Sequence, residues 1–346
     1  MERSLPIRYP SITSWTWIAN TFAILETYDN TKEWLYNNFV NLFCETYDEW
    51  VSLHYLPHVE VFSISPFFKS ALLERKIIRS ISPDIITFIK KCIDLDYYVY
   101  CKVDDHFISK DHKLLHELLI YGYNDSNSQF DIADFTLSDS QKYTFSKTSY
   151  KNIQLSIDAV MDEEDDMQDG IGGDGGIFIF CVNKHQKYSF NAELFKAYLD
   201  DYISCKCSSN LYRTNKLEIP TSFSVGLKKI RCGLAVYDTL IEYCTNLIEG
   251  KNYFYIQSFH VLYDHKKLML NRLRYLKDKL NFQISESILS EFESLLIHAE
   301  IIRNLGIKYL LQRDTIVLKK IKQLLKELKD EDEKACLKLF QVLCKL

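Results

Sequence analysis

Two neighbouring stretches, HELLIYGYND (116–125) and FDIADF (130–135), decide the expected fold of this chain. Apolar residues alternate with other residues in both stretches, a pattern that is typical of β-strands. An Asn-Asp pair follows the first strand and favours a turn, so the sequence predicts a β-hairpin. His116 begins the first strand, and Asp134 lies near the end of the second. We expect the hairpin to bring the imidazole within reach of the carboxylate.

The composition indicates a chain with more than one hydrophobic core. It has 346 residues, of which 47% are hydrophobic, and single cores usually stop growing near ~250–300 residues. Strand-like sequence gives way to helical periodicity near residue 190. The sequence therefore predicts an α+β domain over residues 1–189 and an all-α domain over residues 190–346.

The distribution of charges and cysteines excludes several classes of protein. Net charge is −5, and no basic cluster is interleaved with aromatic residues, so nucleic acid is not the expected partner. The chain lacks an apolar run of ~18 residues and an export signal, which argues against a membrane protein or a secreted one. Cys205 and Cys207 are closely spaced, but their spacing favours neither a zinc knuckle nor a disulfide framework. We expect a cytoplasmic protein without a metal or cofactor.

Apolar periodicity and turn residues predict the individual elements. Strands are expected at 58–64, 96–103, 116–123, 130–134, 152–160 and 177–183. Helices are expected at 15–28, 33–47, 67–78, 83–92, 190–204, 221–249, 252–280, 284–311, 313–329 and 334–345. The acidic, glycine-rich segment 162–176 is interpreted as a surface loop, with weak cation binding as the alternative.

The spacing of His116 and Asp134 suits general base catalysis. A histidine accepts a proton well when its other ring nitrogen donates to a carboxylate that fixes the tautomer. The alternative is a half-buried histidine bonded to the backbone and an aspartate in an Asx turn. Upstream, Asp104, Asp105 and His106 predict a polar loop at the rim of the cleft, with substrate positioning as a second interpretation.

The nucleophile of such a site should stand at the N-terminus of a helix, where backbone N–H groups lower the pKa of a thiol. Ser14 occupies that position before the helix expected at 15–28, and no cysteine precedes Cys44. Ser14 is either a nucleophile or an N-cap whose hydroxyl satisfies a free N–H group. Cys44, on the helix expected at 33–47, is interpreted as a small buried hydrophobe.

The quoted hairpin resembles the N-terminal domain of the butirosin-biosynthesis acyltransferase family. The sequences VDDHFIS (103–109), KKIRCGLAVYDTLIEY (228–243) and FHVLYDHKKLMLNRLRYL (259–276) are also similar to the family, so the resemblance covers most of the chain. It is strongest with members found in nonribosomal peptide gene clusters.

This resemblance implies a papain-like fold and acyl transfer from a carrier-protein thioester to an amine. His116 matches the base and Asp134 the orienting acid, but the cysteine position is unmatched around Ser14. Three explanations remain: Ser14 replaces the thiol, His116 acts directly on the acceptor amine, or the site is a noncatalytic binding pocket. The expected partner is a phosphopantetheinyl carrier protein or a peptide-type substrate.

Overall fold

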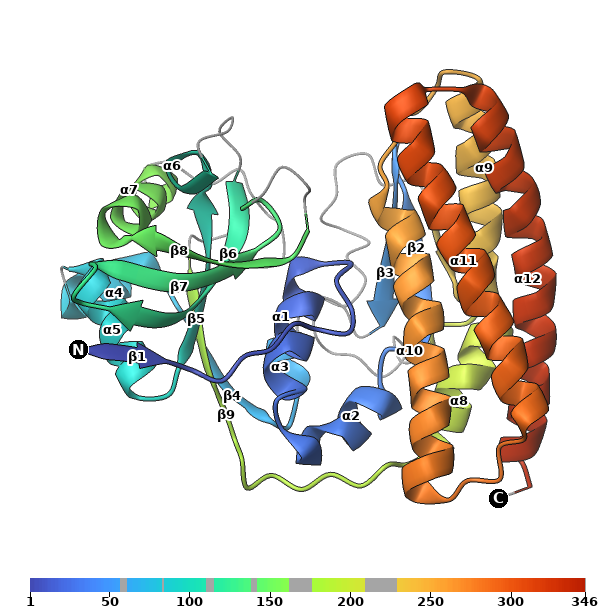
Figure 1. The fold of residues 1–346 in the computed structure, drawn as a ribbon, viewed down its shortest axis with the longest axis horizontal. Coiled ribbons are helices and arrows are strands. Elements are labelled where there is room, and N and C mark those ends of the chain that lie inside the picture. The colour runs from blue at the N-terminus through green and yellow to red at the C-terminus, as the bar shows by residue number, and fades with distance from the viewer. Residues whose placement is uncertain are drawn as a thin grey trace. The chain divides into compact units, whose positions relative to one another are not determined.

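The computed structural model divides the chain into two compact units. Unit 1 comprises Met1–Lys32 and Val59–Tyr188, and unit 2 comprises Glu33–His58 and Ser189–Leu346 (Figure 1). The structure describes residues 1–56, 61–82, 84–109, 115–137, 142–161, 176–208 and 229–345. Residues 162–175 of the acidic segment and the predicted helical residues 221–228 therefore lie outside the described residues.

Unit 1 is built on an antiparallel sheet of seven strands (Figure 1). These are β1 (Glu2–Ser4), β4 (Phe68–Leu73), β5 (Tyr98–Asp104), β6 (Leu115–Asn124), β7 (Gln129–Asp134), β8 (Thr144–Ser149) and β9 (Ile177–Val182). Their order is β4-β9-β5-β6-β7-β8, and β1 pairs with the end of β6. All seven residues of β5 are buried, because the strand has neighbours on both sides. The predicted hairpin is β6-β7, and the antiparallel sheet expected after residue 96 is confirmed.

Helices of unit 1 cover and extend this sheet. They are α1 (Thr16–Leu25), α3 (Val61–Ile64), α4 (Arg75–Ile81), α5 (Ile85–Asp94), α6 (His106–Ser109), α7 (Tyr150–Met161) and the 3₁₀ helix η1 (Asp29–Thr31). Both α5 and α7 pack on β5. Helix α5 begins at Asp84, whose carboxylate accepts a hydrogen bond from the Ile86 N–H group.

Three predictions within unit 1 are wrong. Residues 61–64 are helical instead of extended, and the helix expected at 67–78 is strand β4 followed by α4. Strand β4 pairs along its whole length with β9, and such a partner overrides local helical periodicity. The strand expected at 152–160 is helix α7, in which Ile153 and Ile157 are one turn apart and both fully buried.

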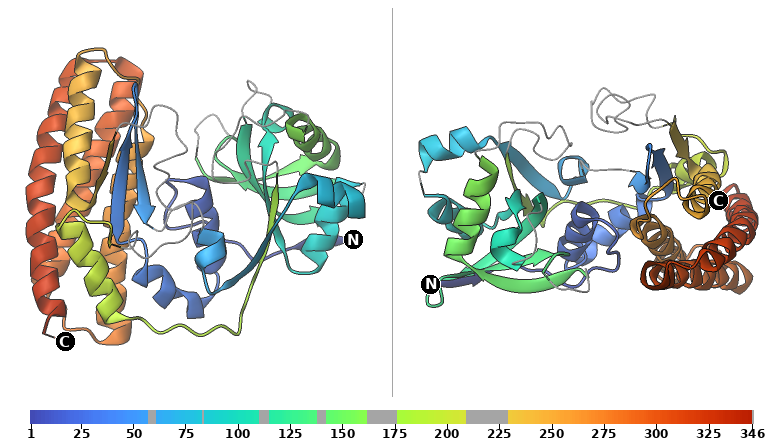
Figure 2. Two further views of the ribbon diagram at one scale, coloured as in Figure 1. Left: turned by 180° about the vertical axis from the view of Figure 1, so that it is seen from behind. Right: turned by 90° about the horizontal axis from the view of Figure 1, so that it is seen from above.

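Unit 2 combines a small antiparallel sheet with long helices (Figure 2). Its strands are β2 (Asn41–Thr46), β3 (Val51–Leu56) and β10 (Lys229–Cys232), in the order β10-β2-β3. Its helices are α2 (Lys32–Asn37), α8 (Ala192–Ile203), α9 (Val236–Ile248), α10 (Gln257–Leu280), α11 (Glu286–Gln312), α12 (Thr315–Leu343) and the 3₁₀ helix η3 (Gly233–Ala235). Helix α10 packs on β3 and α11, and α12 packs on α9 and α11. The C-terminal region from α9 onward is all helical, as predicted.

The sheet of unit 2 corrects two predicted helices. The helix expected at 33–47 ends at Asn37, and the one expected at 221–249 begins with strand β10 in its described part. Between α2 and β2 the chain turns at Phe39, whose φ is 58°. Helix α10 holds this turn, because His265 Nε2 donates to the Val40 carbonyl at 2.8 Å and the Arg272 guanidinium donates to the Asn38 carbonyl at 2.6 Å.

A buried polar cluster joins α8, α9, α10 and α12 inside unit 2. The Lys266 ammonium and the Asp332 carboxylate form an ion pair, and their side chains are 0% and 1% exposed. The hydroxyls of Tyr202 and Tyr237 donate to the same carboxylate at 2.6 and 3.0 Å. Separate helices were predicted at 313–329 and 334–345, and this prediction is wrong. The acidic residues between them continue helix α12, and Asp332 lies on the buried face of that helix.

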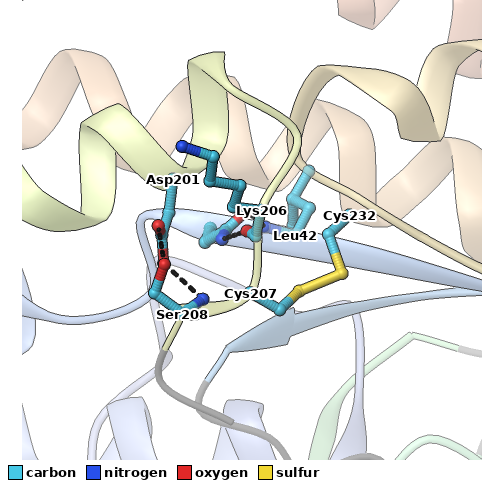
Figure 3. The surroundings of a disulfide bond; sticks show 7 residues. Leu42, Asp201, Lys206, Cys207, Ser208 and Cys232 are labelled. Carbon is cyan, nitrogen blue, oxygen red and sulfur yellow. Dashed lines mark hydrogen bonds between the residues drawn. A yellow bond between two sulfur atoms is a disulfide. The ribbon is translucent and has the colours of Figure 1, made fainter. Parts of the chain in front are cut away.

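A disulfide between Cys207 and Cys232 links the segment after α8 to β10 (Figure 3). The same segment is held by Asp201, whose carboxylate accepts hydrogen bonds from the Ser208 hydroxyl at 2.7 Å and its N–H group at 2.9 Å. The other eight cysteines are free thiols. The expectation of a chain without a disulfide is thus wrong at this pair, whose 25-residue separation carries no recognisable motif.

Candidate functional site

The candidate site lies in unit 1, where three central strands meet at one end of the sheet. Strand β5 ends at Asp104, which pairs with Leu115, and the next residue pair is Val103 with His116. Strand β7 ends at the same edge with Asp134. Because neighbouring strands are antiparallel, the end of β5, the start of β6 and the end of β7 bring their polar residues together.

His116 and Asp134 form a hydrogen-bonded pair. The His116 Nδ1 atom lies 2.8 Å from Asp134 Oδ1 and 2.9 Å from Oδ2. The carboxylate also accepts hydrogen bonds from the Phe135 N–H group at 2.6 Å and the Thr136 hydroxyl at 2.9 Å. Its side chain is 0% exposed, whereas that of His116 is 22% exposed. The two residues thus meet as the hairpin predicted, and their catalytic roles stay a prediction.

The electrostatics of the pair favour the charged imidazole. Burial acts to lower the pKa of His116, but the hydrogen bond and the charge of Asp134 outweigh it, with help from Glu117 and Asp105. Together they raise the pKa of His116 to about 9. A histidine with this pKa is about 1% neutral at pH 7. The resting site therefore holds an imidazolium paired with a carboxylate.

Ser14 does not join this pair in the structure. Its side chain is buried, and its hydroxyl makes no hydrogen bond to any described residue, His116 included. The N-cap interpretation is also wrong, because the N-cap of α1 is Trp15 and no side chain caps the helix there. A buried hydroxyl without a partner costs free energy and calls for an explanation. Ser14 therefore remains a candidate nucleophile by its position alone.

The cysteines of unit 1 do not supply a reactive thiol beside His116. Cys101 lies within β5, and burial raises its pKa to about 11. Cys92 lies in α5, and burial raises its pKa to about 12. The third, Cys181, lies in β9 and lines a different cavity. Cys44 is fully buried in unit 2, in strand β2 instead of a helix, and its pKa is raised by burial.

Several buried polar groups near the pair also have no partner among the described residues. These are the Tyr100 hydroxyl, the Asn20 Nδ2 group and the Asp105 Oδ1 atom. Asn20 lies in α1, and its Oδ1 accepts a hydrogen bond from the Tyr143 hydroxyl at 2.6 Å. Burial and the charge of Asp134 raise the pKa of both Tyr100 and Tyr143. Each of these groups calls for an explanation, such as a bound ligand, a water molecule or a catalytic role.

Sequence reasoning missed Asn20 and Tyr143. Asn20 interrupts the otherwise apolar run WIANTFAIL of α1 and is 0% exposed, so a polar residue on a buried helix was the available signal. Tyr143 had no such signal, because its partner lies more than a hundred residues away in the sequence. Asp104 and Asp105, predicted on a polar loop, are both buried: Asp104 ends β5 and Asp105 directly precedes α6.

A cavity in unit 1 lies at the other end of β5 from His116. Its volume is about 240 Å³, and its lining includes Lys69, Tyr98, Cys181, Lys184 and His185. Tyr98 begins β5 and Asp104 ends it, so this cavity is separated from His116 by the length of the strand. Its lining also includes Asp96, whose carboxylate pairs with Arg3 and not with a histidine, so the cavity is the weaker candidate for catalysis.

Metal and membrane sites were also considered within the described parts of the chain. There, no group of three or more His, Cys, Asp or Glu side chains is arranged to hold a metal ion. No helix of the described residues is long and apolar enough to cross a membrane.

No model of a known protein family matches the chain, and no curated protein sequence matches it significantly. The family resemblance therefore rests on the quoted residues, and the activity has to be argued from the site.

Proposed function

We propose that the chain transfers an acyl group from a carrier-bound thioester to an amine, with His116 as the general base and Asp134 as the acid that orients it. The observation that carries the proposal is the short contact between His116 Nδ1 and the buried Asp134 carboxylate. The resemblance to the butirosin acyltransferase family, and to its papain-like fold, supports the same assignment. An antiparallel sheet with a buried helix near the N-terminus is consistent with that fold.

The reaction needs a nucleophile, and Ser14 is the residue in the matching position. Its hydroxyl oxygen would attack the thioester carbonyl, His116 would take the hydroxyl proton, and the C–S bond would break to release the carrier thiol with that proton. The amine would then attack the ester, form the amide and restore the Ser14 hydroxyl. In the direct route, His116 takes a proton from the amine, which attacks the thioester without an ester intermediate, and the C–S bond breaks to release the carrier thiol with that proton. In both routes the imidazole must first lose its proton, so the rate should rise with pH towards about 9, the pKa of His116.

A noncatalytic binding module is the second candidate, and one observation favours it. Ser14 and His116 are not hydrogen-bonded, and His116 is an imidazolium at neutral pH. A site of this kind would hold a carrier protein or peptide intermediate in the cleft without turning it over.

Covalent trapping distinguishes the three possibilities. Wild-type protein, Ser14→Ala and His116→Ala are each incubated with an acyl-pantetheine thioester and, separately, with a fluorophosphonate, and intact masses are measured. The serine route predicts an adduct on the wild type that both variants lack. Amide formation without an adduct indicates the direct route. Binding of the thioester without an adduct or amide product contradicts acyl transfer and leaves the binding module.

A further inference from the structure

Asp105 adds a second carboxyl group to the site, one residue beyond the end of β5. Its backbone carbonyl accepts hydrogen bonds from the N–H groups of Ile108 and Ser109, which fixes the residue at the start of α6. The Ser109 hydroxyl donates to Asp105 Oδ2 at 2.7 Å. Asp105 is 2% exposed, and its Oδ1 atom has no hydrogen-bond partner among the described residues.

The environment of Asp105 is shared with the His116 pair. Electrostatic interactions connect its carboxyl group to both His116 and Asp134, and the Thr136 hydroxyl that donates to Asp134 also interacts with Asp105. Burial and the charge of Asp134 raise the pKa of Asp105 above 3.8, although the hydroxyls of Ser109 and Thr136 act against the rise. One imidazolium thus interacts with two carboxyl groups, and Asp105 Oδ1 is the oxygen that has no hydrogen-bond partner among the described residues.

An unsatisfied carboxylate oxygen in a buried place requires a donor, and a positive charge would suit it best. Leaving such an oxygen without a donor costs the free energy of its desolvation, which is larger for a charged group. Among the described residues no donor bonds to Oδ1, because the hydroxyl of Ser109 is directed to the other oxygen and that of Thr136 is directed to Asp134. A ligand with N–H groups and a positive charge would satisfy the oxygen and balance the excess of carboxylates.

We propose that Asp105 binds the acceptor of this site, and that the acceptor is a primary amine that arrives as an ammonium ion. The inference rests on the proposed function in identifying this amine as the acyl acceptor. The amine enters beside His116, whose side chain is partly exposed, and donates an N–H group to Asp105 Oδ1. The neutral imidazole of His116 then takes one ammonium proton, which leaves a neutral amine with a lone pair beside the Asp105 carboxylate.

Asp104 provides a matched control for this role. It is the neighbouring residue, it is 4% exposed, and its Oδ1 atom already accepts a hydrogen bond from the His106 N–H group at 3.1 Å. Replacing either aspartate by asparagine removes one negative charge from the same strand end and keeps the size of the side chain. Of these two aspartates, Asp105 is the one with a buried oxygen that has no hydrogen-bond partner among the described residues.

Binding of a simple amine tests the proposal without any acyl chemistry. Propylammonium is titrated into the full-length protein while the ring protons of His116 are followed by NMR, and tetramethylammonium, which has no N–H group, is titrated separately. Because a hydrogen bond to a charged group contributes about 1.5–3 kcal/mol, Asp105→Asn should weaken propylammonium binding about 10- to 100-fold. Asp104→Asn should leave the affinity for propylammonium within about threefold of the wild type. This variant removes a negative charge that salt partly screens, but it removes no hydrogen bond to the ligand.

Several outcomes overturn the proposal. They are equal weakening by Asp104→Asn and Asp105→Asn, equal affinity for tetramethylammonium and propylammonium, and no binding of propylammonium by the wild type. If thermal unfolding shows that Asp105→Asn does not fold, Ser109→Ala takes its place. This variant removes the donor to Asp105 Oδ2 and should also change the affinity for propylammonium. An unchanged affinity contradicts the role of Asp105.

The proposed function can fail independently of this inference. Propylammonium binding that depends on Asp105, together with no amide from any acyl-pantetheine thioester, refutes acyl transfer and preserves the amine site. Amide formation in which Asp105→Asn changes neither the KM of the amine nor its binding refutes the amine site and preserves acyl transfer.

Discussion

At the scale of single residues, the ion pair of His116 and Asp134 ties stability to pH. The pKa of His116 in the folded protein is raised from 6.5 to about 9. The folded state therefore holds this proton more tightly than the unfolded chain does. The resulting stabilisation is fully present below about pH 6.5 and is lost as the pH rises through about 9. From the size of the shift it amounts to about 3 kcal/mol at most.

Replacing the imidazole should remove this pH dependence. The free energy of unfolding, measured by urea denaturation at pH 6 and pH 9.5, should fall more in the wild type than in His116→Gln. The difference between the two proteins isolates His116 from the other groups that titrate in this range. Parallel curves for the two proteins would show that the pKa of His116 is not raised.

Lys266 illustrates how a buried charge depends on its partner. Its ammonium is enclosed with Asp332, and Tyr202 supplies a further contact at 2.9 Å. Lys266→Met should destabilise the protein by about 3–5 kcal/mol, because it leaves the Asp332 carboxylate buried without a counter-charge.

The double variant Lys266→Met/Asp332→Asn is the control for this prediction. It removes both charges while the amide oxygen still accepts hydrogen bonds from Tyr202 and Tyr237, so it should be more stable than Lys266→Met. Chemical denaturation compares the two variants, and a double variant less stable than Lys266→Met would contradict the charge argument.

At the scale of elements, the disulfide between Cys207 and Cys232 constrains the connection from α8 to β10. For a loop of 25 residues, the chain-entropy argument gives about 3.5 kcal/mol of stabilisation. Cys207→Ser and Cys232→Ser should each lower the free energy of unfolding by this order. Cys205→Ser is the matched control, since Cys205 is exposed and free.

Alkylation of free thiols followed by mass spectrometry identifies the cysteines that are linked. Labelling of both Cys207 and Cys232 in unreduced protein, or equal stability of Cys207→Ser and the control, would show that the link does not form in solution.

The elements also show what local sequence can and cannot predict. Strands β5, β6, β7 and β9 were predictable because their signal is local: apolar residues alternate in β6 and β7, and β5 and β9 are rich in β-branched and aromatic residues. Strand β2 and helix α7 were not, because apolar residues in short runs fit either period. What decides β2 is its pairing with β3 and β10, and β10 is more than 180 residues further along the chain.

At the scale of the whole molecule, unit 2 is assembled from two separate parts of the sequence. Residues 33–58 pack with residues 189–346, and no composition shift marks the change at residue 33. Residues 33–58 belong to unit 2 partly because His265 and Arg272 donate hydrogen bonds to the turn before β2. These bonds join residues more than 220 positions apart in the sequence. The boundary predicted near residue 190 locates only one of the three points at which the chain passes from one unit to the other.

The candidate site was predictable to the extent that it is local. His116 and Asp134 belong to one hairpin, so their contact followed from strand alternation. The unsatisfied groups of Asn20, Tyr100 and Asp105 depend on how α1 and three strands pack, which the sequence does not display. The identity of the nucleophile depends on the same packing.

The central claim is that His116 is the base of an acyl transfer reaction. It is tested most directly by the rate at which the protein releases thiol from an acyl-pantetheine thioester in the presence of propylamine, with amide formation measured alongside. His116→Ala should lower this rate by about 10²- to 10⁴-fold, the usual contribution of general acid–base catalysis. Turnover by His116→Ala at the wild-type rate, or no amide formation by the wild type at any pH between 6 and about 9, would contradict the claim.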